Sequence, residues 1–366
     1  MKRIPSLLSN ERMARLRAIG LTTTLARSAL PLLTAHPQAE LTRVVEVQRE
    51  HGALHDGEAE QAARLLPALR HGLEAAADAV AVGDWVLAER NRFGERWVGA
   101  RVPPANQLAR RIHDGRDKVA RMVIVANVDT ALLVMGLDHD FTPRRLERFL
   151  ALARMAGVAP LVVLTKADLC RDVQARLAAV RGLLPAGTEA IALNALGPEP
   201  RELLAPWLGT GQTLVLLGSS GAGKSTLTNA LAGDEVQATG ASRAGDSRGR
   251  HTTTARSLHR TAGGACIIDT PGLRTLRLDG DAAALGQAFD DVASAALRCR
   301  FRDCRHQGEP GCAVSEAVAP DRLRNFHKLQ REAERDTMSA LERKAQVAQW
   351  KARSRATRVR MSAKRG

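Results

Sequence analysis

Gly218-Ser-Ser-Gly-Ala-Gly-Lys-Ser-Thr226 decides the fold, and it directly follows the apolar run 213–217. A strand that ends in GxxxxGK[ST] and passes into a helix points successive backbone N–H groups at one place, where they can bind nucleotide phosphates. In such a loop Lys224 neutralises the β- and γ-phosphates and the Ser225 hydroxyl binds Mg²⁺. An ordinary Gly/Ser turn is the alternative, and the preceding strand argues against it. We therefore predict phosphate contacts from Gly218, Ser219, Ser220, Gly221, Ala222, Gly223, Lys224, Ser225 and Thr226.

The length and composition indicate two or three globular domains. The chain has 366 residues, of which 45% are hydrophobic and none is tyrosine, so its cores must be built mainly from Leu, Val, Ile and Ala. No apolar run approaches the ~20 residues that cross a bilayer, and residues 1–5 lead into a charged segment rather than an apolar signal core. We expect a cytoplasmic monomer without a membrane partner, whose five cysteines do not form a disulfide framework.

The net charge of +15 is concentrated at the two ends of the chain. From Glu342 onward there are nine Lys/Arg and one acid, a net charge of +8, and residues 1–27 hold six basic groups against Glu11 alone. Two basic ends favour a polyanionic partner, most simply nucleic acid bound through its phosphates. Solvated tails that only keep the chain soluble are the alternative.

The N-terminal third is the least regular part of the sequence. Residues 1–37 resemble an irregular or partly helical basic arm, and short β-like pieces follow at 41–47, 84–88 and 97–102. The intervening segment 57–82 is rich in Ala, Leu and Glu and could form a helix instead.

A clear βα alternation begins near residue 122. Short apolar runs predict buried strands, and the segments between them predict helices, of which the first begins at Thr142 and Pro143. The result is a mostly parallel sheet with helices on both faces and a ligand site beyond the carboxyl ends of its strands. The predicted strands are 122–126, 131–135, 161–164, 190–193, 213–217 and 265–268, and the predicted helices are 142–156, 171–183, 199–207, 224–232, 285–298 and a helix opened by Pro320.

Two further motifs stand at strand ends and complete a nucleotide site. In Thr165-Lys-Ala-Asp168, the Asp168 carboxylate can accept hydrogen bonds from N1–H and the exocyclic amine of guanine, which adenine does not offer. In Asp269-Thr-Pro-Gly272, the Asp269 carboxylate can reach the Mg²⁺ shell and the Gly272 N–H a γ-phosphate. The pattern predicts GTP rather than ATP, with base contacts from Thr165, Lys166, Ala167 and Asp168.

The Gly/Ser/Arg-rich stretch 239–250 leads into Gly249-Arg-His-Thr-Thr-Thr254. Such a loop could order around Mg²⁺ and the γ-phosphate and be released on hydrolysis, and we take Thr253 as its metal-binding threonine. A plain Ser/Thr surface loop is the alternative.

A cysteine cluster follows the α/β region. Cys299, Cys304, His306 and Cys312 lie within fourteen residues, and three thiolates with one imidazole suit tetrahedral Zn²⁺. Because four protein ligands leave no position open for a catalytic water, we predict one structural zinc; inert thiols are the alternative. Four arginines between the ligands offset the thiolate charge and present donors to phosphates: Arg298, Arg300, Arg302 and Arg305.

The order of motifs identifies a family. The guanine motif precedes the phosphate loop, whereas ordinary small GTPases place it last, so the chain resembles a circularly permuted GTPase. GRHTTT, DTPG and the cysteine cluster resemble the ribosome small-subunit-dependent GTPase A family, also called RsgA or YjeQ. The resemblance implies a basic arm (1–37), an OB-type RNA-binding barrel (38–115), a permuted GTPase domain (116–284), a zinc-binding helical domain (285–335) and a basic tail (336–366).

The resemblance also implies an activity, namely GTP hydrolysis during late maturation of the small (30S) ribosomal subunit, stimulated by that particle and its 16S rRNA. Two rivals stay open: a permuted GTPase of the large subunit, and a zinc-dependent rRNA-binding module that only senses guanine nucleotide. Because the DTPG motif leads toward the cysteine cluster, we hypothesise that loss of the γ-phosphate shifts the zinc domain.

Three positions depart from the usual GTPase pattern. Thr165 stands where Asn usually holds the base and braces the phosphate loop, which would reduce guanine affinity, and Asn194-Ala195 replaces a Ser-Ala pair beside the base. Leu273 stands where many GTPases carry a glutamine that orients the attacking water. His251 is our candidate for that task, with a phosphate-contacting or loop-stabilising histidine as the alternatives.

Overall fold

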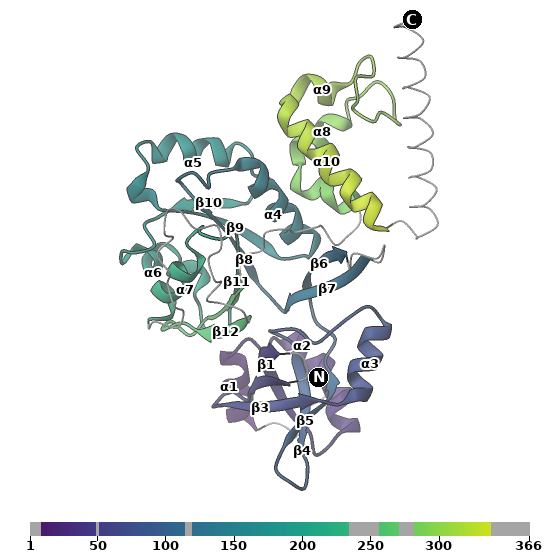
Figure 1. The fold of residues 1–366 in the computed structure, drawn as a ribbon, viewed down its shortest axis with the longest axis vertical. Helices are drawn as coiled ribbons and strands as arrows, with labels where there is room; N and C mark the ends of the chain where they lie inside the picture. The colour runs from purple at the N-terminus through teal and green to yellow at the C-terminus, as the bar shows by residue number, and fades with distance from the viewer. Residues whose placement is uncertain (1–8, 49–50, 114–118, 234–255, 271–281, 338–366) are drawn as a thin grey trace, which may run out of the picture.

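The computed structural model describes residues 9–48, 51–113, 119–233, 256–270 and 282–337. These residues form a β-barrel with the N-terminal helices beside it, a central α/β domain, and a C-terminal group of helices (Figure 1). Among the described helices, none combines the length and apolarity needed to cross a bilayer.

The N-terminal barrel has five strands and is closed. The order is β1 (Glu40–Gln48), β2 (His51–His55), β3 (Glu60–Leu65), β5 (Arg96–Arg101) and β4 (Trp85–Arg90), and β4 pairs back with β1. Its interior holds a separate cluster of small and branched side chains: Val44, Leu54, Ala63, Val80, Val86, Ala88 and Val98. The predicted OB-type barrel is confirmed, including its strands near 41–47, 84–88 and 97–102.

The helix considered for 57–82 is correct only in part. Residues 60–65 form strand β3, and only α3 (Pro67–Ala75) is helical. The letters EQAARL favour a helix, but β3 pairs antiparallel with β2 and parallel with β5. Pairing on both edges outweighs a local preference that amounts to a few tenths of a kcal/mol per residue.

The N-terminal arm contains two helices, α1 (Asn10–Ala18) and α2 (Thr23–Ala35), each begun by a side-chain cap from Ser9 and Thr22. Their apolar residues share one buried cluster with the outer face of the barrel: Leu16, Leu25, Ala29 and Leu33 with Leu41, Val45, Trp85 and Leu87. The described part of the arm, with both its helices, therefore packs on the barrel.

A hairpin of β6 (Gln107–His113) and β7 (Val119–Ala126) leads into the α/β domain. Five parallel strands follow in the order β10 (Glu189–Ala192), β9 (Ala159–Thr165), β8 (Thr130–Gly136), β11 (Thr213–Leu217) and β13 (Cys266–Asp269). β12 (Ser257–Arg260) pairs antiparallel with β13 and, through Ser257 opposite Glu46, with β1 of the barrel. The mostly parallel sheet is as predicted except for its first strand: residues 122–126 lie in β7, which pairs antiparallel with β6 in a separate two-stranded sheet. β6 and β12 were not predicted.

Helices cover both faces of this sheet because its strands alternate between two cores. One face packs Leu133, Met135 and Val215 against α4 (Pro143–Met155) and α5 (Val173–Arg181). The other packs Leu132, Val134 and Leu214 against α7 (Lys224–Ala232), beside α6 (Glu199–Leu203) and the 3-10 turn Ala205–Trp207. Such two-sided burial explains the continuous apolar runs of the sequence.

The C-terminal helices pack on α4 rather than on the barrel (Figure 1). They are the 3-10 helix η3 (Ala282–Ala288), α8 (Asp290–Ala296), α9 (Ala313–Ala317) and α10 (Pro320–Thr337). The helix predicted over 285–298 is divided between η3 and α8, and the helix opened by Pro320 is present. The third predicted region is thus helical, with the cysteine cluster between α8 and α9.

Candidate nucleotide site and metal centre

The phosphate loop connects β11 to α7 at the carboxyl edge of the sheet. Gly221 (φ 82°) and Gly223 (φ 91°) adopt left-handed conformations that side chains rarely tolerate. At Gly218 an added Cβ would lie 2.4 Å from the carbonyl oxygen of Val134. The glycines of the motif are therefore required by its backbone path, as expected of a loop that wraps around phosphate groups.

Lys224 begins α7 and lies back over the loop. Its ammonium donates to the carbonyl oxygens of Gly218 (3.0 Å) and Ser219 (2.7 Å). Burial lowers the pKa of Lys224, while the nearby carboxylates of Asp269 and Asp140 act in the opposite direction. A desolvated ammonium held over the loop is suited to bind phosphate oxygens.

Asp269 ends β13 beside the same loop. The residue is 2% exposed, and Oδ1 has no hydrogen-bond partner in the part of the chain that the structure describes. Burial raises the pKa of Asp269 to about 6, although Lys224 and a hydrogen bond from Ser225 lower it. A buried carboxylate oxygen without a partner, next to the Ser225 hydroxyl, is a donor set that fits Mg²⁺.

The base motif reaches the phosphate loop through its first residue. Thr165 is fully buried, and its hydroxyl donates a 2.6 Å hydrogen bond to the carbonyl oxygen of Ala222. Thr165 thus braces the loop although it replaces the usual Asn. Asp168 follows in the short turn η1 (Ala167–Leu169), and its side chain is exposed.

A third loop lies beside the base motif. The Ala167 N–H donates to the carbonyl of Leu193 (3.3 Å), and the Asn194 side chain accepts from the Leu196 N–H (2.9 Å). The segment 193–196 is therefore folded against η1, which places Asn194-Ala195 next to the motif that we expected it to assist.

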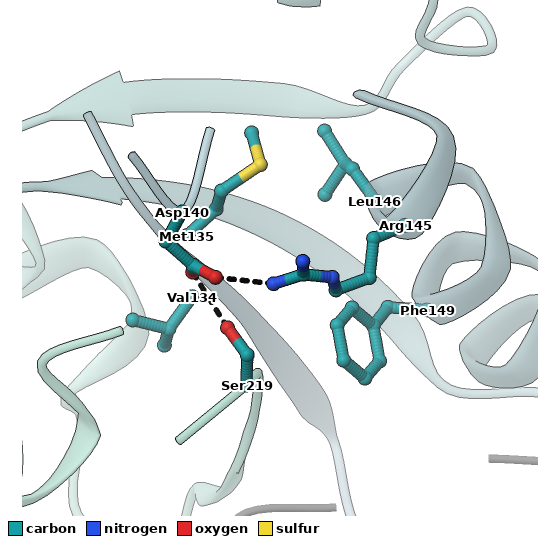
Figure 2. A pocket seen from close by; sticks show the side chains of 7 residues that line it. All are labelled: Val134, Met135, Asp140, Arg145, Leu146, Phe149 and Ser219. Atoms are coloured by element: carbon teal, nitrogen blue, oxygen red, sulfur yellow. Dashed lines mark hydrogen bonds and ion pairs between the residues drawn. The ribbon is translucent and has the colours of Figure 1, made fainter. Parts of the chain in front are cut away.

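Sequence reasoning did not single out Asp138, Asp140 or Arg145. Asp140, in the loop after β8, accepts a 2.5 Å hydrogen bond from Ser219 of the phosphate loop and pairs with Arg145 of α4, as Figure 2 shows. In the same loop Asp138 pairs with Lys166 of the base motif (2.6 Å). Burial alone would raise the pKa of Asp138, but the bonds from Lys166 and the Asp140 N–H hold it below its ordinary value.

Several predicted residues lie outside the described part of the chain, namely His251, Thr252–Thr254, Gly272 and Leu273. Of the DTPG motif, Asp269 and Thr270 are described, and the Thr270 hydroxyl donates to the carbonyl of Leu216 (2.7 Å). The bond fixes the start of this motif against β11.

The predicted metal ligands do come together. One ligand atom each from Cys299, Cys304, His306 and Cys312 lies within 4.8 Å of the others. His306 Nδ1 is 3.6 Å from Cys299 Sγ and 3.5 Å from Cys312 Sγ. Tetrahedral Zn–S and Zn–N bonds place S and N about 3.6 Å apart, so this cluster fits a zinc ion.

The surroundings of the cluster support it as a metal centre. His306 has a left-handed backbone (φ 59°), and its carbonyl lies 3.0 Å from His327 Nε2 on α10. The Cys312 thiolate accepts from the Ser315 N–H and hydroxyl; these bonds hold its pKa below the ordinary value, against burial, which would raise it. Four exposed arginines lie among the ligands in the sequence: Arg298, Arg300, Arg302 and Arg305.

Comparison with known proteins gives consistent matches. Residues 102–279 match the model of the RsgA GTPase family. A curated relative from Xanthomonas campestris pv. campestris (strain B100), named Small ribosomal subunit biogenesis GTPase RsgA, is 44% identical over 304 residues, 81% of this chain and 82% of that one. A relative of the same name from Xanthomonas axonopodis pv. citri (strain 306) is 44% identical over 307 residues, 82% of this chain and 83% of its own.

Two crystal structures share the fold. YjeQ from Thermotoga maritima is 24% identical, with a TM-score of 0.58 over 81% of this chain and 98% of its own. YloQ, described as a circularly permuted GTPase, is 22% identical, with a TM-score of 0.56 over 83% of this chain and 98% of its own. In both cases nearly the whole of the known structure is matched.

Proposed function

This chain belongs to the RsgA GTPase family, and we propose that it hydrolyses GTP to GDP and phosphate during maturation of the small ribosomal subunit. The observation that carries the proposal is the contact between Thr165 and Ala222, which joins the base motif to the phosphate loop at one edge of the sheet. The curated relatives are named for the small subunit, which favours that particle over the large one.

In the proposed site, Asp168 reads the guanine base beside Thr165, Lys166 and Ala167. Residues 218–226 hold the phosphates, with Lys224 on the β- and γ-phosphate oxygens. Ser225, Asp269 and Thr253 would hold Mg²⁺, which supplies positive charge where negative charge develops during transfer to water. The Gly223 and Gly272 N–H groups would donate to the same phosphate oxygens.

The attacking water needs a group to orient it. Leu273 has no polar atom for this task, so we assign it to His251. His251→Ala should abolish particle-stimulated hydrolysis and leave the Kd for GTP within about twofold, because the residue would act on water rather than on the nucleotide. Unaltered stimulated turnover would exclude His251.

The cysteine cluster would hold one structural zinc and present RNA-binding arginines. With four ligands no position is left for a reacting water, so the ion's contribution is to the fold. Chelation should unfold residues 297–318 and weaken binding to 16S rRNA, while the affinity for GDP is retained. Circular dichroism with nucleotide titration would test this; a coincident loss of GDP binding would contradict it.

The decisive experiment is GTP turnover measured with and without purified 30S subunits. We expect slow basal hydrolysis and strong stimulation by 30S but not by 50S particles. Asp168→Asn should shift base preference from guanosine to xanthosine nucleotides, because the amide donates where the carboxylate accepted. Stimulation by 50S particles alone would indicate a factor of the large subunit. Turnover that neither particle accelerates would indicate an RNA-binding module that only senses guanine nucleotide.

A further inference from the structure

The loop that follows β8 lies between the two nucleotide-binding motifs. In the sheet, β8 is flanked by β9, which leads into the base motif, and by β11, which leads into the phosphate loop. Pairing of Gly136 with Thr165 is extended by a hydrogen bond from the Leu137 N–H to the Thr165 carbonyl (2.9 Å). Residues 138–140 therefore leave the sheet at a fixed position beside both motifs.

Asp138 contacts the base-motif side. Its Oδ2 lies 2.6 Å from Lys166 Nζ, and its side chain is 17% exposed, so the pair is partly shielded from water. Lys166 has a left-handed backbone (φ 58°), which is unfavourable for a residue with a side chain. At Gly136 an added Cβ would lie 2.6 Å from Asp138 Oδ1. The absence of a side chain at Gly136 therefore gives the Asp138 carboxylate room beside the strand end. Asp138 thus anchors the strained turn that carries Asp168.

Asp140 contacts the phosphate-loop side. It is 9% exposed, accepts the Ser219 hydroxyl through Oδ2, and is neutralised by Arg145 at Oδ1 (Figure 2). Ser219 is the second residue of the loop, and its carbonyl accepts from Lys224 (2.7 Å). Asp140 therefore fixes the end of the loop at which the catalytic lysine is also held.

We propose that Asp138 and Asp140 are positioning residues of the nucleotide site, with Asp138 holding the base motif through Lys166 and Asp140 holding the phosphate loop through Ser219. The inference rests on the guanine-nucleotide site proposed above and adds a loop that none of its sequence motifs contains. Neither aspartate needs to touch the nucleotide. Both would keep the two halves of the site assembled before the nucleotide binds.

The base side is tested with Asp138→Asn, which keeps the shape of the side chain and removes its charge. The Kd values for GDP and GMP should both rise about tenfold, the change expected on weakening one charge-assisted hydrogen bond. Lys166→Met should raise both Kd values by a similar factor. The double variant should bind no more weakly than Lys166→Met alone, since Asp138 acts through Lys166. Additive losses in the double variant, or a single-variant Kd within twofold of wild type, would overturn this assignment.

The phosphate side is tested by the difference between GDP and GMP. Asp140→Asn should raise the Kd for GDP about tenfold and the Kd for GMP less than twofold, because Ser219 belongs to the phosphate loop. Ser219→Ala removes the same bond from the other partner and should show the same difference even if Asp140→Asn folds poorly. Equal losses for GDP and GMP in the Ser219→Ala variant would overturn the role of Asp140.

The matched control is Asp172→Asn. Asp172 caps α5 by accepting the Ala175 N–H (3.0 Å), a task that Asn performs equally well. Its Kd for GDP should equal that of wild type, and melting curves of all variants would check that they are folded. Absence of GDP binding by the wild-type protein would refute the proposed function itself, whereas tight wild-type binding with unchanged variants would refute only the role of the two aspartates.

Discussion

Thr165 performs with a hydroxyl a task that we assigned to the amide of Asn. The hydroxyl is buried and its acceptor, the Ala222 carbonyl, lies inside the phosphate loop. Replacing Asn by Thr165 therefore keeps the contact that braces the phosphate loop. The reduced guanine affinity that we expect would come only from the lost contact between the Asn amide and the base.

Thr165→Val should weaken nucleotide binding, since valine has the same shape and cannot donate to Ala222. Leaving a buried carbonyl without a partner costs about 1–3 kcal/mol, which corresponds to an increase of roughly 5- to 150-fold in the Kd for GDP. The control is Thr228→Val, because Thr228 is equally buried and its hydroxyl has no partner within the described residues. A Thr165→Val protein that binds GDP as well as the control would contradict the bracing role.

Asp269 should make Mg²⁺ binding depend on pH. Burial raises its pKa to about 6, above the ordinary 3.8, so protons compete with the metal below pH 6. We expect the apparent Mg²⁺ affinity to fall about tenfold per pH unit below 6 and to be constant above 7. Because the folded carboxyl binds its proton more tightly than the unfolded one, its contribution to stability is lost as pH rises from about 4 to 6.

Fluorescent-nucleotide titrations with Mg²⁺ between pH 5 and 8 would measure this dependence. The terminal phosphate of the nucleotide also titrates near pH 6, so the informative quantity is the difference in slope between wild type and Asp269→Asn. Identical slopes would show that Asp269 does not bind the metal.

At the scale of elements, α4 joins the nucleotide site to the C-terminal helices. Glu147 on α4 is 1% exposed and accepts from Arg322 (2.8 Å) and Asn325 of α10. Arg322 also donates to Asp291 of α8 (2.6 and 2.9 Å) and lies over the ring of Phe289. Since Arg145 on the same helix pairs with Asp140, α4 connects phosphate loop and metal centre by a path separate from the DTPG motif.

Arg322→Met should loosen the packing of α10 on α4, while the ion pairs Arg144–Asp321 and Arg148–Glu332 still join the two helices. Removing one partner of a buried ion pair costs about 3–5 kcal/mol. Glu147 keeps its contacts with Arg144 and Asn325, which places the expected loss at the lower end. Urea unfolding and hydrogen exchange of residues 320–334 would measure it. Arg324→Met, at an exposed position of the same helix, should change stability by less than about 0.5 kcal/mol. Unchanged exchange in the Arg322 variant would contradict the coupling.

The elements also show what the sequence could predict. The five parallel strands were found because burial on two faces leaves continuous apolar runs, and α7 was placed at its observed bounds by the phosphate-loop motif. β12 has one buried apolar residue, Leu258, and four residues in all, and it pairs antiparallel with β13 and with β1, so no local pattern marks it. Asp138 and Asp140 resemble ordinary carboxylates after a strand, and only the position of β8 between β9 and β11 gives them a role.

At the scale of the whole molecule, Arg43 joins the barrel to the GTPase sheet, together with the pairing of β1 and β12 at Glu46 and Ser257. It is fully buried in β1 and donates to the Ile19 carbonyl after α1, the Asn127 carbonyl after β7 (3.3 Å) and the Thr213 hydroxyl of β11 (3.0 Å). At Gly20 an added Cβ would lie 2.3 Å from Arg43 Nη1, so the glycine makes room for this guanidinium. Burial lowers the pKa of Arg43, with Cys266, Asp129 and Asp84 opposing it.

Arg43→Met should loosen the joint without disturbing the nucleotide site. Three acceptors would lose a buried charged donor, which costs about 3–5 kcal/mol, and the barrel should then melt separately from the GTPase domain. Thr213 begins β11 while the phosphate loop follows its last residue, Leu217, so the Kd for GDP should change less than about twofold. Arg43→Lys keeps the positive charge but not the several N–H donors of the guanidinium, so its stability should lie between those of the wild type and Arg43→Met. A single calorimetric transition at the wild-type temperature in Arg43→Met would show that Arg43 does not hold the two domains together. Two transitions, with intact GDP binding and reduced stimulation by 30S subunits, would support the joint. They would also indicate that the barrel must be rigidly attached for the particle to activate hydrolysis.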